Sequence, residues 1–316
     1  MPNQTKREPS LAFGGQALIE GVMMRSQKHM VLCVRKPNSE IVTSVETLKP
    51  LAEQYRPLGW PFLRGIVALF ESFYLGIKGL LFSANVAIED EVKEENAKQG
   101  KQSSGGESLK LGYGELAIIA LGVLGIVAFF FLVPFFLATW LHFDPGNWVF
   151  NVVEAVIRLA FFIAYLSLIA TWGQFRRVLQ YHGAEHKAIH AHEAGVPLDV
   201  ENVRKFSRLH PRCGTSFLFI VLIVSIVLFS ILPTLDFVWR LVSRIALIPV
   251  IASISYELLR LSGKYQKSPI LKVFIAPGLG FQLLTTKEPT DDMLEVSIKA
   301  VTEVNRLMCS SLQDKT

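Results

Sequence analysis

Four long apolar stretches follow one another between residues 116 and 259 of the chain. The first of them has 25 residues without a charged side chain. A helix of about 20 apolar residues is long enough to cross the hydrocarbon core of a bilayer. The pattern therefore predicts four transmembrane helices, at residues 116–140, 148–172, 214–235 and 237–259.

Charged residues inside these stretches have simple expected roles. Glu154 and Arg158 are four residues apart, so we expect an ion pair within one helix that eases insertion, rather than a polar pathway. Arg240 and Arg244 lie near the outer end of the fourth stretch. Their long side chains are expected to reach the headgroups.

The distribution of Lys and Arg predicts the orientation. The segments 141–147 and 233–238 contain none, whereas residues 173–213 contain seven. Positively charged loops stay in the cytoplasm. Residues 1–59 carry eight Lys or Arg and are also expected inside. An apolar helix expected at 60–90 would break this parity if it crossed the bilayer, so we expect it to be interfacial or re-entrant.

The remaining segments predict a small α+β portion. Residues 32–36 and 41–48 read as strands around a turn, and residues 14–25 as a glycine-punctuated strand or loop. Residues 269–287 are expected to be extended. Thr290 is expected to cap a final amphipathic helix that packs on the N-terminal strands.

The predicted fold class is a membrane α-helical bundle with a small cytoplasmic α+β portion, formed by the N-terminal strands and the C-terminal segment. Both termini are expected in the cytoplasm and the bundle in the plasma membrane. The expected order is a β-rich region (1–59), the interfacial helix (60–90), a disordered linker (91–112), two spans (113–172), a His-rich loop (173–213), two spans (214–261) and a C-terminal region (262–316).

Composition agrees with this class. Of 316 residues 51% are hydrophobic, and the mean hydropathy is positive. The net charge of +5 comes without a basic stripe interleaved with aromatic residues, so nucleic acid is not an expected partner. The three cysteines are widely spaced, which indicates reduced thiols rather than a disulfide framework.

Candidate chemistry concentrates in residues 181–193, which contain four of the seven histidines. His182, Glu185 and His186 form a His-x-x-Glu-His pattern. On a helix these side chains share one face, where two imidazoles can bind Zn²⁺ and the carboxylate can act as general base. His190 and Glu193 continue the stripe as expected ligands or supporting residues.

His210 and Cys213 form a second cluster on the same loop. In a catalytic site, His182 and His186 would bind zinc with His210, Cys213 or Glu257 as third ligand. In a structural site, the ligands would be His182, His186, His210 and Cys213. The simplest alternative is solvated histidines on a juxtamembrane helix. Glu257 is expected to pair with Arg260 or Lys264 rather than with a metal.

Five sequence blocks carry a resemblance to a known family. They are GGQALIEGVMMR, YHGAEHKAIH, HPRCGTSF, SYELLRLSGKY and APGLGFQLLTTKEPTDDMLEVSIKA. Together they resemble the YqhQ-like family of bacterial membrane proteins, described as predicted metal-dependent enzymes, over residues 12 to 308. The resemblance implies a metal at His182, Glu185, His186, His210 and Cys213.

Two functional hypotheses follow. One is a zinc-dependent hydrolase or protease at the cytoplasmic membrane surface, with a peptide or membrane-protein substrate and Glu185 as catalytic residue. The alternative is a non-enzymatic assembly factor or scaffold with a structural metal site. A transporter is disfavoured because the chain shows four spans, few interior charges and no inverted repeat. The lipid bilayer is the one partner that both hypotheses require.

Overall fold

The computed structural model describes residues 13–99, 113–141, 148–211, 213–231, 237–264 and 269–313. The first part of the chain forms four strands and two short helical turns: β1 (Gly14–Leu18), β2 (Gly21–Arg25), β3 (His29–Arg35), β4 (Ile41–Thr47), α1 (Leu51–Gln54) and η1 (Arg56–Gly59). Helices follow: α2 (Leu63–Gln99), α3 (Tyr113–Trp140), α4 (Trp148–Thr171), α5 (Gly173–Ala194), α6 (Val200–Arg204), α7 (Gly214–Ile231), α8 (Phe237–Ala246), α9 (Ile248–Lys264), α10 (Pro269–Thr285) and α11 (Asp291–Gln313).

The four strands form one antiparallel sheet in the order β1-β2-β3-β4. The two strands expected at residues 32–36 and 41–48 are confirmed as β3 and β4. Residues 14–25 form two strands, β1 and β2, joined by a tight turn in which Glu20 has a φ of 52°. Gly21 follows this turn, where a Cβ atom would lie 2.3 Å from the carbonyl oxygen of Cys33, so close pairing with β3 requires glycine.

Alternate residues of the sheet enter two different cores. In β3, Val31 and Cys33 face one core, whereas Leu32 and Val34 face the other. The first core lies between the sheet and helices α5, α6 and α11. The expected amphipathic helix is confirmed as α11, which packs on β2 and β3 with residues that include Leu294, Val301, Val304 and Met308.

The opposite face of the sheet is covered by α2. Leu75 and Val86 belong to the second core, and Gly76 and Gly79 allow β1 to approach the helix closely. The helix continues to Gln99, so residues 91–99 are helical rather than part of a linker. Residues 100–112, the rest of the expected linker, lie outside the described residues.

Five helices in the described part of the chain are long and apolar enough to cross a membrane, by length and composition alone. They are Leu63–Ala87, Ala117–Trp140, Val149–Thr171, Gly214–Ile231 and Val242–Leu261. The last four correspond to the four expected spans, and the first, Leu63–Ala87, lies in α2. The stretch expected at 237–259 is interrupted at Leu247, between α8 and α9, two residues before Pro249, which cannot donate a backbone hydrogen bond.

Residues 269–287 are predicted to be extended, but most of them form helix α10. Pro277 lies inside this helix. Phe281 stacks on Phe162 of α4, at 5.5 Å between ring centroids, and Gly278 allows a close approach to Ser216 of α7. Packing against two neighbouring helices buries the apolar side of this segment, which explains why tertiary context outweighs the Pro-Gly turn signal.

A buried ionic triad links α4 to α8. The expected pair of Glu154 and Arg158 is present, and Arg244 also donates to Glu154 at 2.5 Å. All three side chains are buried. Arg244 therefore does not reach for headgroups as expected, because the carboxylate of Glu154 holds it inside. The side chain of Arg240 lies outside the described residues.

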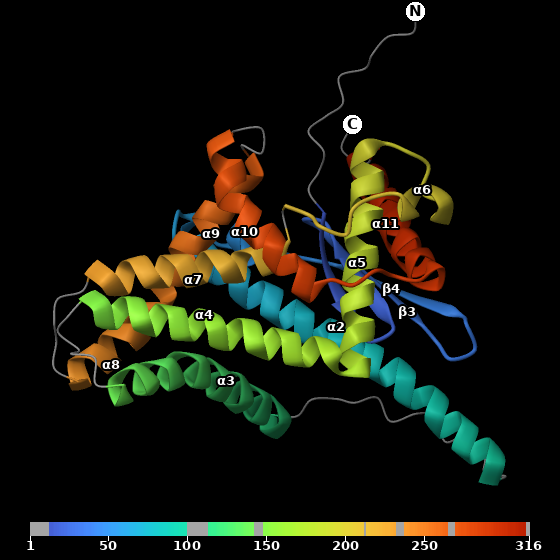
Figure 1. Ribbon diagram of the computed structural model, residues 1–316. Helices are drawn as coiled ribbons and strands as arrows, with labels where there is room; N and C mark the ends of the chain where they lie inside the picture. The colour runs from blue at the N-terminus through green and yellow to red at the C-terminus, as the bar shows by residue number, and fades with distance from the viewer. Residues whose placement is uncertain are drawn as a thin grey trace, which may run out of the picture.

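Figure 1 shows how these parts are arranged. Helices α3, α4 and α7 run beside one another, and the C-terminal end of α3, the N-terminal end of α4 and the C-terminal end of α7 lie at the same end of the bundle. The sheet, α5 and α11 lie at the opposite end. Helix α5 leaves α4 at a steep angle, so the His-rich segment lies at the junction between the bundle and the α+β portion.

Candidate metal centre

Helix α5 presents the candidate ligands in one stripe. His182, His186, His190 and Glu193 follow one another at intervals of four, four and three residues, so they lie on one face. The helix ends at Gly195, which adopts the left-handed conformation with a φ of 68°. Regular helical geometry up to this cap keeps the four side chains aligned.

The segment that follows α10 packs directly on α5. The backbone N–H of Lys287 donates to the carbonyl of Leu179 at 2.9 Å. At Gly183, a Cβ atom would lie 2.2 Å from the carbonyl oxygen of Lys287. Glycine within the His-x-x-Glu-His pattern is therefore explained by close packing, which also brings Thr285 next to His182.

Residues 208–210 run back along the ligand stripe of α5. The ring N–H at Nδ1 of His186 donates to the carbonyl of Arg208 at 2.6 Å, and Nε2–H of His190 donates to the carbonyl of Leu209 at 2.8 Å. Gln282 of α10 bonds both the backbone N–H and the carbonyl of His210. This segment is thus held from both sides, which places Cys213 over the helix.

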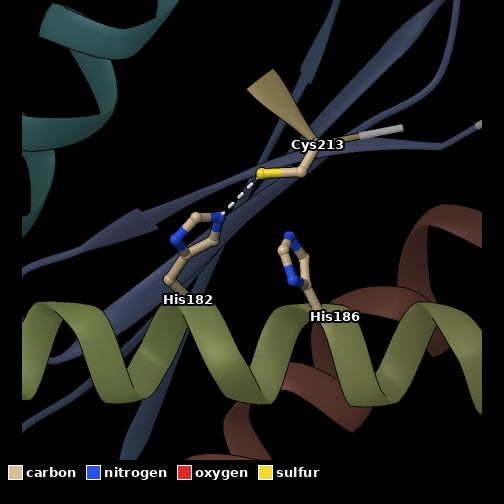
Figure 2. Close-up of side chains that lie close together, drawn as sticks. All are labelled: His182, His186 and Cys213. Atoms are coloured by element: carbon tan, nitrogen blue, oxygen red, sulfur yellow. Dashed lines mark hydrogen bonds between the residues drawn. The ribbon is translucent and has the colours of Figure 1, made fainter. Parts of the chain in front are cut away.

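His182, His186 and Cys213 form the first group of donors. One ligand atom from each lies within 4.8 Å of the other two, and Nε2 of His182 is 3.1 Å from Sγ of Cys213. Figure 2 shows both imidazoles rising from α5 toward the thiol, which comes from the segment before α7. Ligand atoms around a tetrahedral zinc lie about 3.3–3.6 Å apart, which is close to the 3.1 Å between His182 and Cys213.

Backbone carbonyls fix the ring nitrogens that face this group. Nδ1–H of His182 donates to the carbonyl of Thr285 at 2.8 Å, as Nδ1–H of His186 does to Arg208. A carbonyl oxygen can only accept, so Nδ1 carries the proton and Nε2 keeps its lone pair. Metal-binding histidines commonly show this arrangement, in which the second nitrogen donates to a carbonyl.

The surroundings of Cys213 favour its thiolate. Burial raises the pKa of the thiol, but interaction with the protonated form of His186 and hydrogen bonds from Thr215 outweigh burial, so the pKa lies below its usual value. The Thr215 hydroxyl is 3.2 Å from Sγ, and its backbone N–H donates to Sγ at 3.4 Å. The thiolate is the form that binds metals.

Glu185 lies beside the first group on the side of the sheet. Its side chain packs on Gly15 of β1, where a Cβ atom would lie 2.3 Å from Oε1. Burial raises the pKa of this carboxyl to about 8, His182 lowers it and Cys213 raises it. Oε2 is buried and has no hydrogen-bond partner among the described residues. A buried carboxyl group without such a partner lowers stability, and a chemical role in the site would explain why it is retained.

His190, Glu193 and His210 form a second group, whose ligand atoms also lie within 4.8 Å of one another. The sequence predicts that His210 joins His182, His186 and Cys213, but the structure groups it with the next turn of α5. The two groups are neighbours, since the rings of His186 and His210 are 5.6 Å apart between centroids. His190 and Glu193, expected as ligands or supporting residues, thus belong to a second donor set.

Glu257 lies outside both groups. Its carboxylate accepts two hydrogen bonds from the guanidinium of Arg64, at 2.7 and 2.5 Å. The expected partners, Arg260 and Lys264, are near in sequence, whereas Arg64 is 193 residues away on α2. The pair joins α2 to α9, and Glu257 is accounted for as a structural partner.

The sequence pattern does not reveal the roles of Gln282 and Thr285. The side chain of Gln282 and the carbonyl group of Thr285 position the ligand segments from α10. The available signal is the block APGLGFQLLTT, in which the Pro-Gly pair favours an interrupted extended segment. Reading this block as a helix aligns Gly278 and Gln282 on one face, four residues apart.

Comparisons with known proteins agree on one family. A family model described as "Protein of unknown function (DUF1385)" matches residues 60–307. The chain is 37% identical over 324 residues to "Uncharacterized protein YqhQ" of Bacillus subtilis (strain 168), covering 98% of each chain. No solved structure matches. The resemblance found in the five sequence blocks is thereby confirmed: the chain belongs to the family of proteins of unknown function DUF1385, and it is similar to the YqhQ protein over nearly its whole length.

Proposed function

We propose that this protein binds a zinc ion through His182, His186 and Cys213 and acts as a metal-dependent hydrolase at the membrane surface. The supporting observation is the convergence of three donor atoms within 4.8 Å beside a buried carboxyl oxygen that has no hydrogen-bond partner in the described part of the chain. Two imidazoles and a thiolate form a donor set that suits zinc. Three protein ligands, rather than four, are typical of catalytic zinc.

Each residue of the site has its own proposed role. Zinc held by three protein ligands supplies Lewis acidity and an open coordination position. Thr285 and Arg208 orient the two imidazoles through their carbonyl groups. Oε2 of Glu185 accepts a proton as general base, and a pKa near the neutral range is the most effective for this role. Gly15 leaves the space in which that carboxyl group lies.

A peptide or a segment of a membrane protein is the proposed substrate class. The donor group lies between the middle of α5 and the start of α7, where the apolar bundle meets the α+β portion. A chain that emerges from the bilayer would reach this junction first. The edge strand β1 lies beside Glu185 and offers backbone groups with which an extended peptide can pair.

A second candidate function is a non-enzymatic assembly factor or scaffold with a structural metal. The observation in its favour is that the first group ties α5 to the start of α7, and that His186 and Cys213 are buried. In this case the metal stabilises the segment before α7, and Glu185 has no chemical task. The two candidates differ in the effect of replacing Glu185.

Cobalt substitution tests the metal site. The wild-type protein, purified in detergent and loaded with Co²⁺, is expected to show a thiolate-to-cobalt charge-transfer absorption. Cys213→Ser should abolish this absorption and weaken zinc binding by more than about 100-fold, since a ligand contributes more than the outer-shell partners that are worth roughly 10–100-fold. Glu185→Gln should leave the absorption unchanged.

Cys33→Ser is the matched control, because Cys33 is a buried thiol in the sheet, outside both donor groups. Its cobalt spectrum should equal that of the wild type. A wild-type protein that is folded but shows no charge-transfer absorption on cobalt loading would exclude the proposed ligand set.

We also propose that the bundle spans the plasma membrane with both termini in the cytoplasm, and that α2 does not cross it. Residues 75–86 of α2 pack on the β-sheet, and Lys78 pairs with Glu46 of β4. An open sheet does not enter the hydrocarbon region. Helix α2 therefore lies at the membrane interface, in accord with the parity of the positively charged segments.

Cys309 offers a direct test of this topology. It is an exposed free thiol on α11, whereas Cys33 and Cys213 are buried. A membrane-impermeant maleimide should label it in inverted membrane vesicles and leave it unlabelled in intact cells. Cys309→Ser should abolish the labelling in vesicles. Labelling of intact cells that disappears in Cys309→Ser would place α11 and the sheet outside.

A further inference from the structure

We propose that His190, Glu193 and His210 bind a second divalent metal ion, directly beside the zinc site. This inference extends the proposed function, because it makes the centre a pair of neighbouring sites. It depends on different residues, so it can fail or hold independently of the first site.

The geometry of the second group matches a metal site. One donor atom from each residue lies within 4.8 Å of the other two. Nε2 of His210 is 3.6 Å from Oε2 of Glu193, which is longer than a hydrogen bond. This 3.6 Å distance agrees with the separation of about 3.3–3.6 Å between ligand atoms around a tetrahedral zinc. Two imidazoles and one carboxylate are a known donor set for catalytic zinc.

The backbone already positions the residues of the second group. Nε2–H of His190 donates to the carbonyl of Leu209, which fixes the orientation of this ring. Gln282 holds the backbone of His210 on both sides through two hydrogen bonds. His190 and Glu193 are three residues apart on α5 and share a face. The side chains of this group therefore lose little conformational entropy when a metal ion binds.

The four imidazoles form a continuous row. Ring centroids are 4.5 Å apart between His182 and His186, 5.6 Å between His186 and His210, and 4.6 Å between His190 and His210. His186 and His210 therefore stand at the border between the two groups. Donor sets this close place two cations within reach of one substrate, as in hydrolases that use two metal ions.

The metal content of the full-length protein tests this proposal. The tag-free protein in detergent is stripped with chelator, loaded with zinc, and separated from unbound zinc before analysis. Wild type should hold two zinc ions per chain. Glu193→Gln, which keeps the shape of the side chain, and His190→Ala should hold one. The double variant Cys213→Ser/Glu193→Gln should hold none.

His192→Ala is the matched control, because it removes an imidazole of the same helix that belongs to neither group. It should hold two ions. In cobalt-loaded protein, Glu193→Gln should keep the thiolate charge-transfer absorption while losing one ion, since Cys213 belongs to the other site.

The different failures are distinguishable. A wild-type protein that holds a single zinc ion, lost in Cys213→Ser and kept in Glu193→Gln, would overturn the second site and leave the first intact. A single ion that is lost in Glu193→Gln and kept in Cys213→Ser would support the second site and contradict the proposed function. Two ions that persist in both Glu193→Gln and His190→Ala would also overturn the inference.

Discussion

A strain in which the only copy of the protein carries Glu185→Gln is expected to resemble a deletion strain, although the variant folds and binds metal. The amide has nearly the same shape as the carboxyl group, so packing against Gly15 is retained. The amide cannot act as a general base, because it lacks the carboxylate oxygen that accepts a proton. Loss of a general base typically costs about 10²–10⁴-fold in rate. The catalytic hypothesis therefore predicts normal protein levels with nearly complete loss of function.

The measurement does not require a known substrate. Membrane proteins and peptides are compared by mass spectrometry among wild type, deletion and Glu185→Gln strains. Species that accumulate in the deletion strain should accumulate equally with Glu185→Gln. Glu201→Gln is the control, since Glu201 is an exposed carboxylate on α6 that pairs with Lys205. If Glu185→Gln restores the wild-type pattern, the scaffold hypothesis replaces the hydrolase.

Glu154→Gln is expected to have the largest effect on stability. The carboxylate of Glu154 faces two buried guanidinium groups, those of Arg158 and Arg244. Removing one partner of a buried ionic cluster costs about 3–5 kcal/mol, because the remaining charges stay in a medium of low polarity. The rings of Phe229 and Phe131 lie against the guanidinium of Arg158 at 5.5 and 5.0 Å and offset only part of this cost.

Thermal unfolding of the detergent-purified protein measures this effect. Glu154→Gln should lower the midpoint strongly. A triple replacement of Glu154, Arg158 and Arg244 by leucine should come close to wild type, because it removes the charges together. Glu201→Gln, in an exposed pair, should leave the midpoint unchanged. A midpoint for Glu154→Gln equal to wild type would mean that the triad contributes nothing to stability.

The two charged clusters in the helical part have different origins. The pair of Glu154 and Arg158 lies within one helix, so spacing alone predicts it. Arg244 and Arg64 meet their carboxylate partners only through contacts between helices that are far apart in sequence. No local pattern reports which helix approaches which. The headgroup contact expected for Arg244 is therefore wrong, and Arg64, the hydrogen-bond partner of Glu257, is a residue that spacing does not predict.

The sequence by itself determined the elements whose signal is local. The length of the apolar stretches predicts α3, α4 and α7, and alternation with a turn predicts β3 and β4. The polar first turn and apolar face predict α11. The spacing of His182, Glu185 and His186 predicts a shared face if the segment is helical, and the segment expected as a His-rich loop contains helix α5.

Tertiary structure decided that α10 is helical and which donors meet. Helix α10 forms despite Pro277 because packing partners outweigh local propensity, whereas the division between α8 and α9 has a local cause in Pro249. His210 joins His190 and Glu193, rather than Cys213, because Gln282 holds its backbone over that turn of α5. Gln282 lies 72 residues further along the chain, and its approach to His210 depends on the docking of α10 against α7, which residue spacing does not report.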